Sequence, residues 1–331
     1  MPDPRLDGLG RWLLPISSIA LSVAFLGLGI ALLYRRVDLD DINRILLGLD
    51  KTWLALAMVS YWLANVINSV RFMLVARWLA PRGAPLAVSF AFIFRMVCAA
   101  GFIAVVAPIG LVSDVAKVGA LRLSGSMSIT SAARATLFDR VVPIQCMGVF
   151  GFICAAFQAS HGVSAQVIGI QLLLFFGIAV GVLLLLALPH LLHWLRIALV
   201  SRVARMFEGY YLMLAPDRVL IQLAITFLGA LSVWATLYCL IRAAHLEADW
   251  WLVASFVPFL QIINSVPFLY LGWGGRELAM AATLGTVGGL SLNETLAISA
   301  AWGMTLLVTG GVNGVFLLGG WRSGERSRPP G

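Results

Sequence analysis

The sequence predicts an all-α polytopic membrane protein, a transmembrane helical bundle of about eight spans with two re-entrant or broken segments. Of its 331 residues, 61% are hydrophobic and only 11% are charged, whereas soluble domains have about 45–50% apolar and about 25% charged residues. The apolar residues form long continuous runs rather than the alternating pattern of barrel strands. Since only helices and closed barrels satisfy every backbone polar group in a bilayer, these runs indicate helices.

Eight apolar runs are long enough to cross about 30 Å of hydrocarbon, which takes roughly 20 residues. They are residues 12–34, 53–75, 86–107, 136–157, 166–189, 218–242, 250–271 and 296–318. Arg35 and Arg36 follow the first run directly, so we expect a retained helix rather than a cleaved signal peptide.

The connecting segments predict one membrane domain with little outside it. Residues 35–51 mix acidic and apolar side chains and indicate a short amphipathic helix at the interface. We expect residues 1–321 to form one membrane domain and residues 322–331 to be a disordered tail. Basic residues fall on both sides in similar numbers, so the orientation of the termini stays open.

Composition also narrows the classes of ligand. The net charge is +8, but the basic residues lie mainly between the apolar runs, where they favour anionic lipid headgroups rather than nucleic acid. The four cysteines all lie in apolar runs and include no C-x-x-C pair, and the histidines are scattered. We therefore predict a multi-pass protein of the cell (inner) membrane without a metal or cofactor.

Ionisable side chains inside the membrane are the candidates for function, because each costs at least about 2.5–3.5 kcal/mol at a helix centre. Adjacent residues on a helix point about 100° apart, so Asp139 and Arg140 must each find another partner. Arg95 needs a carboxylate, a carbonyl or water, and Arg71 either snorkels from a helix end or pairs inside the membrane. The predicted substrate-binding residues are Arg95, Asp114, Lys117, Asp139, Arg140, Trp273, Arg276 and Glu277.

Two similar segments break the apolar pattern, each with a proline, then glycine, then an acid and a base, then a short apolar helix. The predicted hinge residues are Pro108 and Gly110 in the first, and Pro267, Gly272, Gly274 and Gly275 in the second. Broken backbone at membrane depth is tolerated only where protein or a water-filled cavity covers it. Paired breaks mark transport sites in inverted-repeat transporters; the alternative is two ordinary interfacial loops.

The charges at these breaks favour an anionic amphiphile as the ligand. Lys117, Arg140 and Arg276 are able to hold a phosphate by charge-assisted hydrogen bonds. Helix N-termini after the breaks add amide donors. The acidic residues balance these cations in the empty site or carry protons.

Two motifs give the chain a family resemblance. The first is Pro108-x-Gly110-x3-Asp114-x2-Lys117, followed by Leu137-Phe138-Asp139-Arg140. The second is Pro267-x4-Gly272-Trp273-Gly274-Gly275-Arg276-Glu277, and glycines such as Gly310, Gly311 and Gly319 also fit. Over about residues 20–320 the chain resembles the lysylphosphatidylglycerol-synthase transmembrane, or flippase-like, family. It departs at Val112-Ser113, where many members have two glycines, and at Lys117, where many have arginine.

The resemblance implies eight spans and two re-entrant elements around a lipid-sized cavity. In bifunctional relatives this module moves a lipid between leaflets, and a separate soluble domain makes the aminoacyl lipid. We expect no such soluble domain here, so the synthase activity is not carried over and the chain is predicted not to be an enzyme.

Three functions stay open at this point. The first is a flippase-like transporter of an anionic or isoprenoid-type lipid, which would be a phospholipid, a hopanoid-related lipid or a polyprenyl-phosphate-linked lipid. The second is a membrane-embedded transferase acting on a lipid phosphate. The third is a non-catalytic partner of envelope-lipid biosynthesis proteins. The oligomeric state stays open.

Overall fold

The computed structural model describes residues 37–80, 88–107, 111–194, 209–265, 275–285 and 288–318. Every regular element in these residues is helical, which confirms the predicted all-α class. The predicted first span (12–34) and the predicted tail (322–331) lie outside the described residues. The elements are α2 (Leu39–Leu47), α3 (Lys51–Leu79), α4 (Phe90–Val106), α5 (Leu111–Leu123), α6 (Ile129–Ser160), α7 (Ala165–Trp194), η2 (Tyr210–Leu214), α9 (Pro216–Ala243), α10 (Trp250–Asn264), α11 (Gly275–Met280), η4 (Ala281–Gly285), α12 (Leu292–Asn313) and η5 (Gly314–Leu317).

Five helices in the described part of the chain are long and apolar enough to cross a membrane: α3, α6, α7, α9, and α12 continued by η5. Within the predicted runs 86–107 and 250–271, the described residues form α4 with 17 residues and α10 with 15, while residues 86–87 and 266–271 lie outside the described part of the chain. At 1.5 Å per residue α4 and α10 are only about 26 and 23 Å long. Helix α4 starts late because the Ser89 side chain caps it by accepting a hydrogen bond from the Phe92 N–H.

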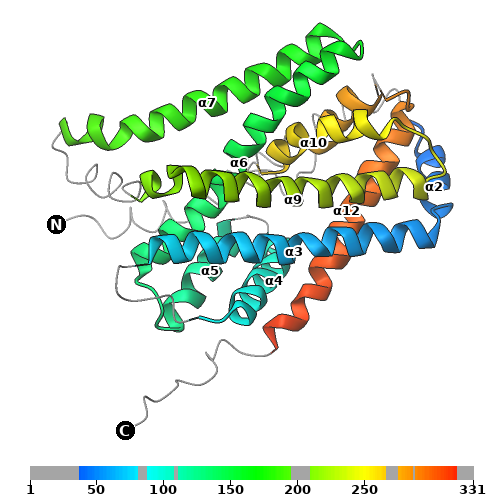
Figure 1. The fold of residues 1–331 in the computed structure, drawn as a ribbon. Helices are drawn as coiled ribbons and strands as arrows, with labels where there is room; N and C mark the ends of the chain where they lie inside the picture. The colour runs from blue at the N-terminus through cyan, green and yellow to red at the C-terminus, as the bar shows by residue number, and fades with distance from the viewer. Residues whose placement is uncertain are drawn as a thin grey trace, which may run out of the picture.

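One end of the bundle is defined by the predicted interfacial helix, α2. It lies across this end beside the start of α12 (Figure 1). The Asp38 N–H donates to Asn293 Oδ1 at 3.1 Å, and Asn293 Nδ2 donates to Asp41 Oδ2 at 3.1 Å. At the same end Asp50 caps α3, and the hydrogen bond from the Trp53 N–H holds the pKa of this carboxyl below its ordinary value.

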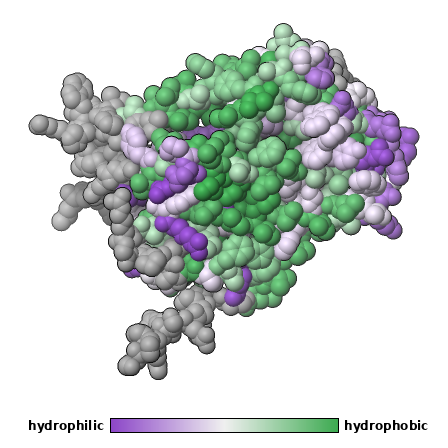
Figure 2. Space-filling model, in the orientation of Figure 1, coloured by the Kyte–Doolittle hydropathy of each residue, from purple (hydrophilic) through white to green (hydrophobic). Residues whose placement is uncertain are grey.

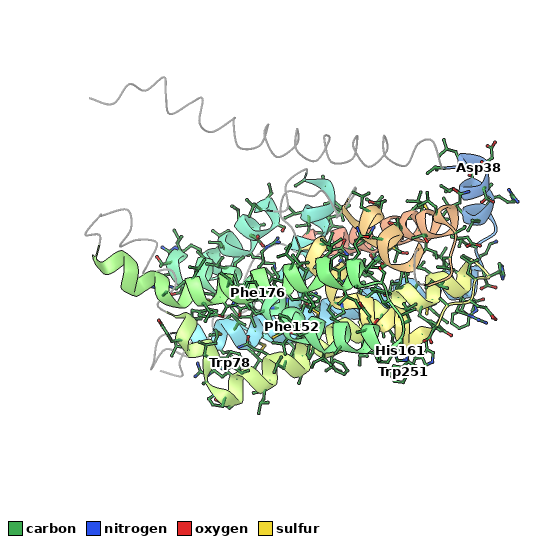
Figure 3. All side chains as sticks on the ribbon, turned by 90° about the horizontal axis from the view of Figure 1, so that it is seen from above. Asp38, Trp78, Phe152, His161, Phe176 and Trp251 are labelled. Atoms are coloured by element: carbon green, nitrogen blue, oxygen red, sulfur yellow. The ribbon has the colours of Figure 1, made fainter. Side chains whose placement is uncertain are left out.

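The opposite ends of the helices carry aromatic side chains that suit two membrane–water interfaces. His161 and Trp251 lie toward the end that carries α2, and Trp78 lies toward the other end (Figure 3). The Arg218 guanidinium stacks on the Trp78 ring with 5.5 Å between them. Between these ends the visible surface is mostly hydrophobic, while hydrophilic residues gather at the α2 end (Figure 2). The bundle therefore has the polarity profile of a membrane-spanning protein.

Helices α3 and α9 run side by side through the middle of the bundle (Figure 1). The Ser60 hydroxyl donates to the Ser232 carbonyl at 3.0 Å, and the Ser232 hydroxyl donates back to the Ser60 carbonyl. Small hydroxyl residues let membrane helices approach closely and bond across the contact. Helix α6 packs against this pair and also contacts α5, α7 and α10.

Helix α7 is held mainly by α6, and Gly151 is a position where the two helices approach closely. A Cβ added at Gly151 would lie 2.3 Å from the Phe175 ring. We expect Gly151→Leu to lower stability by about 1–3 kcal/mol, the usual range for overpacking. The check is thermal unfolding in detergent. The matched control is Gly169→Leu on α7, where an added Cβ meets nothing within 4 Å; equal melting temperatures for both variants would contradict the assigned role of Gly151.

Candidate functional site

Five ionisable side chains from three helices form the first ionic network: Arg71 on α3, Asp114 and Lys117 on α5, and Asp139 and Arg140 on α6. Asp139 accepts hydrogen bonds from both Arg71 Nε at 3.1 Å and Lys117 Nζ at 3.2 Å. Arg140 Nε pairs with Asp114 Oδ2. The adjacent Asp139 and Arg140 thus take different partners, as their helical geometry predicts.

The first ionic network is buried and carries one more cation than carboxylate. The Asp139 side chain is 6% exposed and that of Lys117 14%, whereas that of Arg140 is 35% exposed. The Lys117 ammonium also lies 5.4 Å from the centre of the Phe72 ring. Among the described residues, the buried Asp114 Oδ1 has no hydrogen-bond partner. The network therefore keeps a free acceptor beside cations, with Arg140 as its most accessible member.

A second ionic network joins Arg276 and Glu277 of α11 to Ser299 and Trp302 of α12. Arg276 Nη2 lies 2.9 Å from Glu277 Oε1, and Arg276 Nε donates to Ser299 Oγ at 3.0 Å. The Ser299 hydroxyl donates to Glu277 Oε1 at 2.8 Å, which closes a triangle. The Arg276 side chain is 0% exposed, and its guanidinium lies 5.8 Å from the Trp302 ring.

Short helices position both networks. Helix α5 has 13 residues and α11 has six, followed by the π-helical turn η4. These are the short apolar helices predicted to follow the two breaks. At 1.5 Å per residue α5 is about 20 Å long, too short to cross about 30 Å of hydrocarbon. A π-helical turn often occurs at a functional site.

The two networks lie at different depths of the bundle. With 1.5 Å per residue, Arg71 is about 9 Å from the middle of α3 and Asp139 about 8 Å from the middle of α6, both toward the Trp78 end. Ser299 is about 8 Å from the middle of the helix that runs from Leu292 to Leu317, toward the α2 end. With the middle of each spanning helix taken as the bilayer midplane, both networks lie within the roughly 15 Å half-thickness of the hydrocarbon, on opposite sides of that plane.

The structure groups six of the predicted binding residues into these two networks. It brings Asp114, Lys117, Asp139 and Arg140 together in one, and Arg276 and Glu277 in the other. Arg95 is half-buried on α4, and the described contacts of the two networks do not include it. Gly275 begins α11. The other predicted residues lie outside the described part of the chain: Trp273, Pro108, Gly110, Pro267, Gly272 and Gly274.

Three participants were not predicted as site residues: Arg71, Ser299 and Trp302. For Arg71 the sequence left pairing and snorkelling open, and the bond to Asp139 decides for pairing. Ser299 is a single hydroxyl in an apolar run and gives no signal by itself. Trp302 lies three residues further along α12, on the same helix face as Ser299.

The comparisons with known proteins agree with this architecture. The family model described as "Lysylphosphatidylglycerol synthase TM region" matches residues 19–314, nearly the whole chain. No curated protein matches the sequence. The matched region contains every residue of both ionic networks and all five long helices except the last three residues of η5. The chain therefore belongs to the family of the lysylphosphatidylglycerol synthase transmembrane region.

Proposed function

We propose that this protein moves an anionic or isoprenoid-type lipid between the two leaflets of its membrane. Membership of the family indicates a function connected with membrane lipids. The observation that carries the finer proposal is the first ionic network, which holds three cations and two carboxylates within hydrocarbon depth. Such groups persist in a membrane where they serve a polar substrate or pathway.

A lipid phosphate suits the first ionic network because the network has three cations and only two carboxylates. The phosphate supplies a further negative charge and additional oxygen acceptors. Arg140, the most exposed member, would meet the headgroup first. Guanidinium and ammonium groups bind phosphate through short charge-assisted hydrogen bonds. Asp114 and Asp139 balance two of the three cations before a lipid binds, so that the phosphate exchanges with a carboxylate rather than entering an uncompensated cluster.

The second ionic network offers a second binding site for the headgroup on the other side of the midplane. Arg276 is fully covered and bonded to Glu277 and Ser299. Its exposure to a headgroup would require α11 to move relative to α12. With two cationic binding sites at different depths, a headgroup crosses the hydrocarbon in two shorter movements and binds to cations after each.

The remaining expectations extend the same proposal. We infer that the protein lies in the inner cell membrane, that it acts with proteins of envelope-lipid biosynthesis, and that it transfers lipid without chemical change. Among the described residues, exposed apolar side chains such as Leu173 and Leu220 cover much of the surface between the two ends, which supports a substrate that enters sideways from the bilayer.

Translocation by purified protein in liposomes tests the proposal. Fluorescent phosphatidylglycerol and phosphatidylcholine would be compared by quenching the outer leaflet. We expect Lys117→Gln to slow phosphatidylglycerol movement by about 10- to 100-fold, because one charged hydrogen bond is worth about 1.5–3 kcal/mol and each 1.4 kcal/mol is tenfold. Lys117→Arg keeps the charge and should retain translocation.

The matched control is Arg122→Gln, which removes a cation from the same helix where the side chain is exposed. It should translocate both lipids at the wild-type rate. Unchanged phosphatidylglycerol movement in Lys117→Gln would remove the first ionic network from the pathway. If the wild-type protein moved neither lipid, nor a polyprenyl phosphate, the transport proposal would fall.

A further inference from the structure

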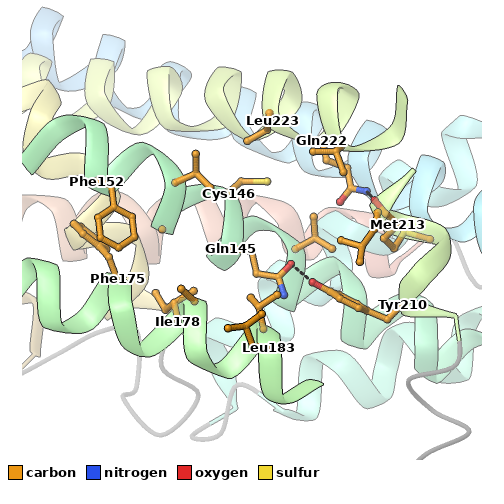
Figure 4. Close-up of a pocket in the computed structure, with 17 residues that line it drawn as sticks. Gln145, Cys146, Phe152, Phe175, Ile178, Leu183, Tyr210, Met213, Gln222 and Leu223 are labelled. Carbon is orange, nitrogen blue, oxygen red and sulfur yellow. Dashed lines mark hydrogen bonds between the residues drawn. The ribbon is translucent and has the colours of Figure 1, made fainter. Parts of the chain in front are cut away.

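An apolar pocket separate from both ionic networks opens between α6, α7, η2 and α9; we name it the α6–α7 pocket (Figure 4). Its volume is about 440 Å³, within the range of about 300–1,000 Å³ that is usual for small-molecule sites. None of the residues that line it is charged. A phosphate would find no counter-charge there, so the pocket suits an uncharged and largely apolar ligand.

Three polar side chains interrupt this apolar lining. The Tyr210 hydroxyl donates to Gln145 Oε1 at 2.6 Å, as Figure 4 shows. Among the described residues, Gln145 Nε2 then has no hydrogen-bond partner. Gln222 is 2% exposed; its Nε2 donates to the Met213 carbonyl at 3.4 Å, and its Oε1 has no partner among the described residues.

The unpartnered amide atoms indicate which polar group the ligand carries. Gln145 Nε2 is a donor and Gln222 Oε1 is an acceptor, and leaving such atoms buried without partners is costly. A hydroxyl group serves either atom, because it both donates and accepts. Both atoms are covered by neighbouring side chains, so a ligand reaches one of them through a rotation of the terminal amide.

The depth of the α6–α7 pocket and its uncharged lining together favour such a ligand over a lipid with a charged head. Gln145 lies at the middle of α6, and Gln222 is about 11 Å from the middle of α9, toward the Trp78 end. The pocket thus extends from near one interface to the centre of the bundle. A charged headgroup is poorly tolerated at that depth without counter-charges, and the lining holds none, whereas a lipid hydroxyl costs much less.

A second pocket provides a contrast. It has about 460 Å³ and lies between α6, α9 and α10. The Ser255 hydroxyl in its lining already donates to the Leu252 carbonyl at 2.7 Å. The unpartnered amides of Gln145 and Gln222 belong only to the lining of the first of these two pockets.

We propose that the α6–α7 pocket is a binding site for an uncharged lipid that carries a hydroxyl group on a long apolar body. The site is distinct from the ionic networks and goes beyond the proposed transport of an anionic or isoprenoid-type lipid. The ligand enters from the bilayer past α7, whose exposed residues such as Ala179 form part of the lining.

Photolabelling of the purified protein in nanodiscs tests this site. The probes are a long-chain alcohol with a diazirine in its chain, the methyl ether of that alcohol, and its phosphate ester. Labelled peptides are mapped by mass spectrometry. The ether accepts a hydrogen bond but cannot donate one to Gln222 Oε1. We therefore expect the alcohol to label α6 and α7 at the pocket roughly two- to tenfold more than the ether, since one neutral hydrogen bond contributes that preference, and the phosphate ester not to compete.

Four variants make the assignment specific. Ala179→Trp fills the pocket and should reduce labelling at least tenfold, whereas Ala187→Trp, at an exposed position of α7 outside the lining, should not. Gln222→Leu should bring the alcohol-to-ether ratio close to one without reducing labelling by the ether. Lys117→Gln should leave all labelling unchanged, because the ionic network is a different site.

Three results would contradict the proposed binding site. Equal labelling by alcohol and ether in the wild-type protein would remove the hydroxyl from the proposal. Labelling that survives Ala179→Trp undiminished would place the probe outside the pocket. Effective competition by the phosphate ester would show a charged-lipid site instead.

Discussion

Replacement of Asp139 by asparagine is expected to destabilise the protein by about 3–5 kcal/mol, the usual result of removing one partner from a buried ion pair. Asp139 is the common partner of Arg71 and Lys117, whose side chains are only 13% and 14% exposed. Without the carboxylate, two cations face each other in a region from which water is largely excluded. The same substitution should abolish lipid translocation, because the helices α3, α5 and α6 lose the contact that aligns them.

The measurement is the free energy of unfolding in mixed micelles, made for Asp139→Asn in the wild-type and in the Lys117→Met background. In the Lys117→Met background, Asp139→Asn should lower the free energy of unfolding by less, because only Arg71 then loses the Asp139 carboxylate. Glu247→Gln is the control: Glu247 is 90% exposed and lies 3.6 Å from Arg242, and such surface pairs contribute about 0–1 kcal/mol. Equal losses for Asp139→Asn in both backgrounds would refute the coupling between Asp139 and Lys117.

The need for partners at Asp139 and Arg140 is predictable from helix geometry, but the identity of those partners is not. A turn of 100° per residue states only that the two side chains point apart. The partner Arg71 lies 68 residues away, on another helix. Side-chain packing across α3, α5 and α6 determines which faces of these helices meet. An apolar run without a polar stripe does not indicate which of its faces contacts another helix.

For the membrane spans, too, the sequence predicts some features and misses others. Length and hydropathy identify the apolar runs, and the mixed pattern of residues 35–51 correctly predicts α2. The start of α4 is set by a local signal that a hydropathy window does not register, the cap at Ser89. Residues 86–107 therefore read as a full span, although α4 has only 17 helical residues.

Uncharged polar residues were the weakest signals in the sequence. Ser299 completes the second ionic network, and Gln145 and Gln222 line the α6–α7 pocket. In a membrane helix, serine and glutamine are common enough to serve as ordinary contacts between helices. Their importance becomes visible only when the structure shows which of their atoms are bonded and which are not.

The second large effect concerns Arg276 and Glu277, where stability and transport are expected to separate. Glu277→Gln alone removes the carboxylate that balances the Arg276 guanidinium, which is 0% exposed. We expect this variant to lower the free energy of unfolding by about 3–5 kcal/mol. Arg276→Met alone removes the Arg276 cation from Glu277 and keeps the hydrogen bond from the Ser299 hydroxyl. The double variant Arg276→Met/Glu277→Gln removes both charges, and such neutral replacements of a buried pair are often tolerated or even stabilising.

The double variant should therefore unfold near the wild-type temperature and yet fail to translocate lipid. This combination distinguishes a transport role from a purely structural one, since a structural pair can be replaced by any well-packed neutral pair. Arg276→Lys adds a second comparison: it keeps the charge but lacks the planar fork that contacts Ser299 and Glu277 together. Wild-type translocation by the stable double variant would show that the second ionic network holds α11 against α12 and has no part in moving the headgroup.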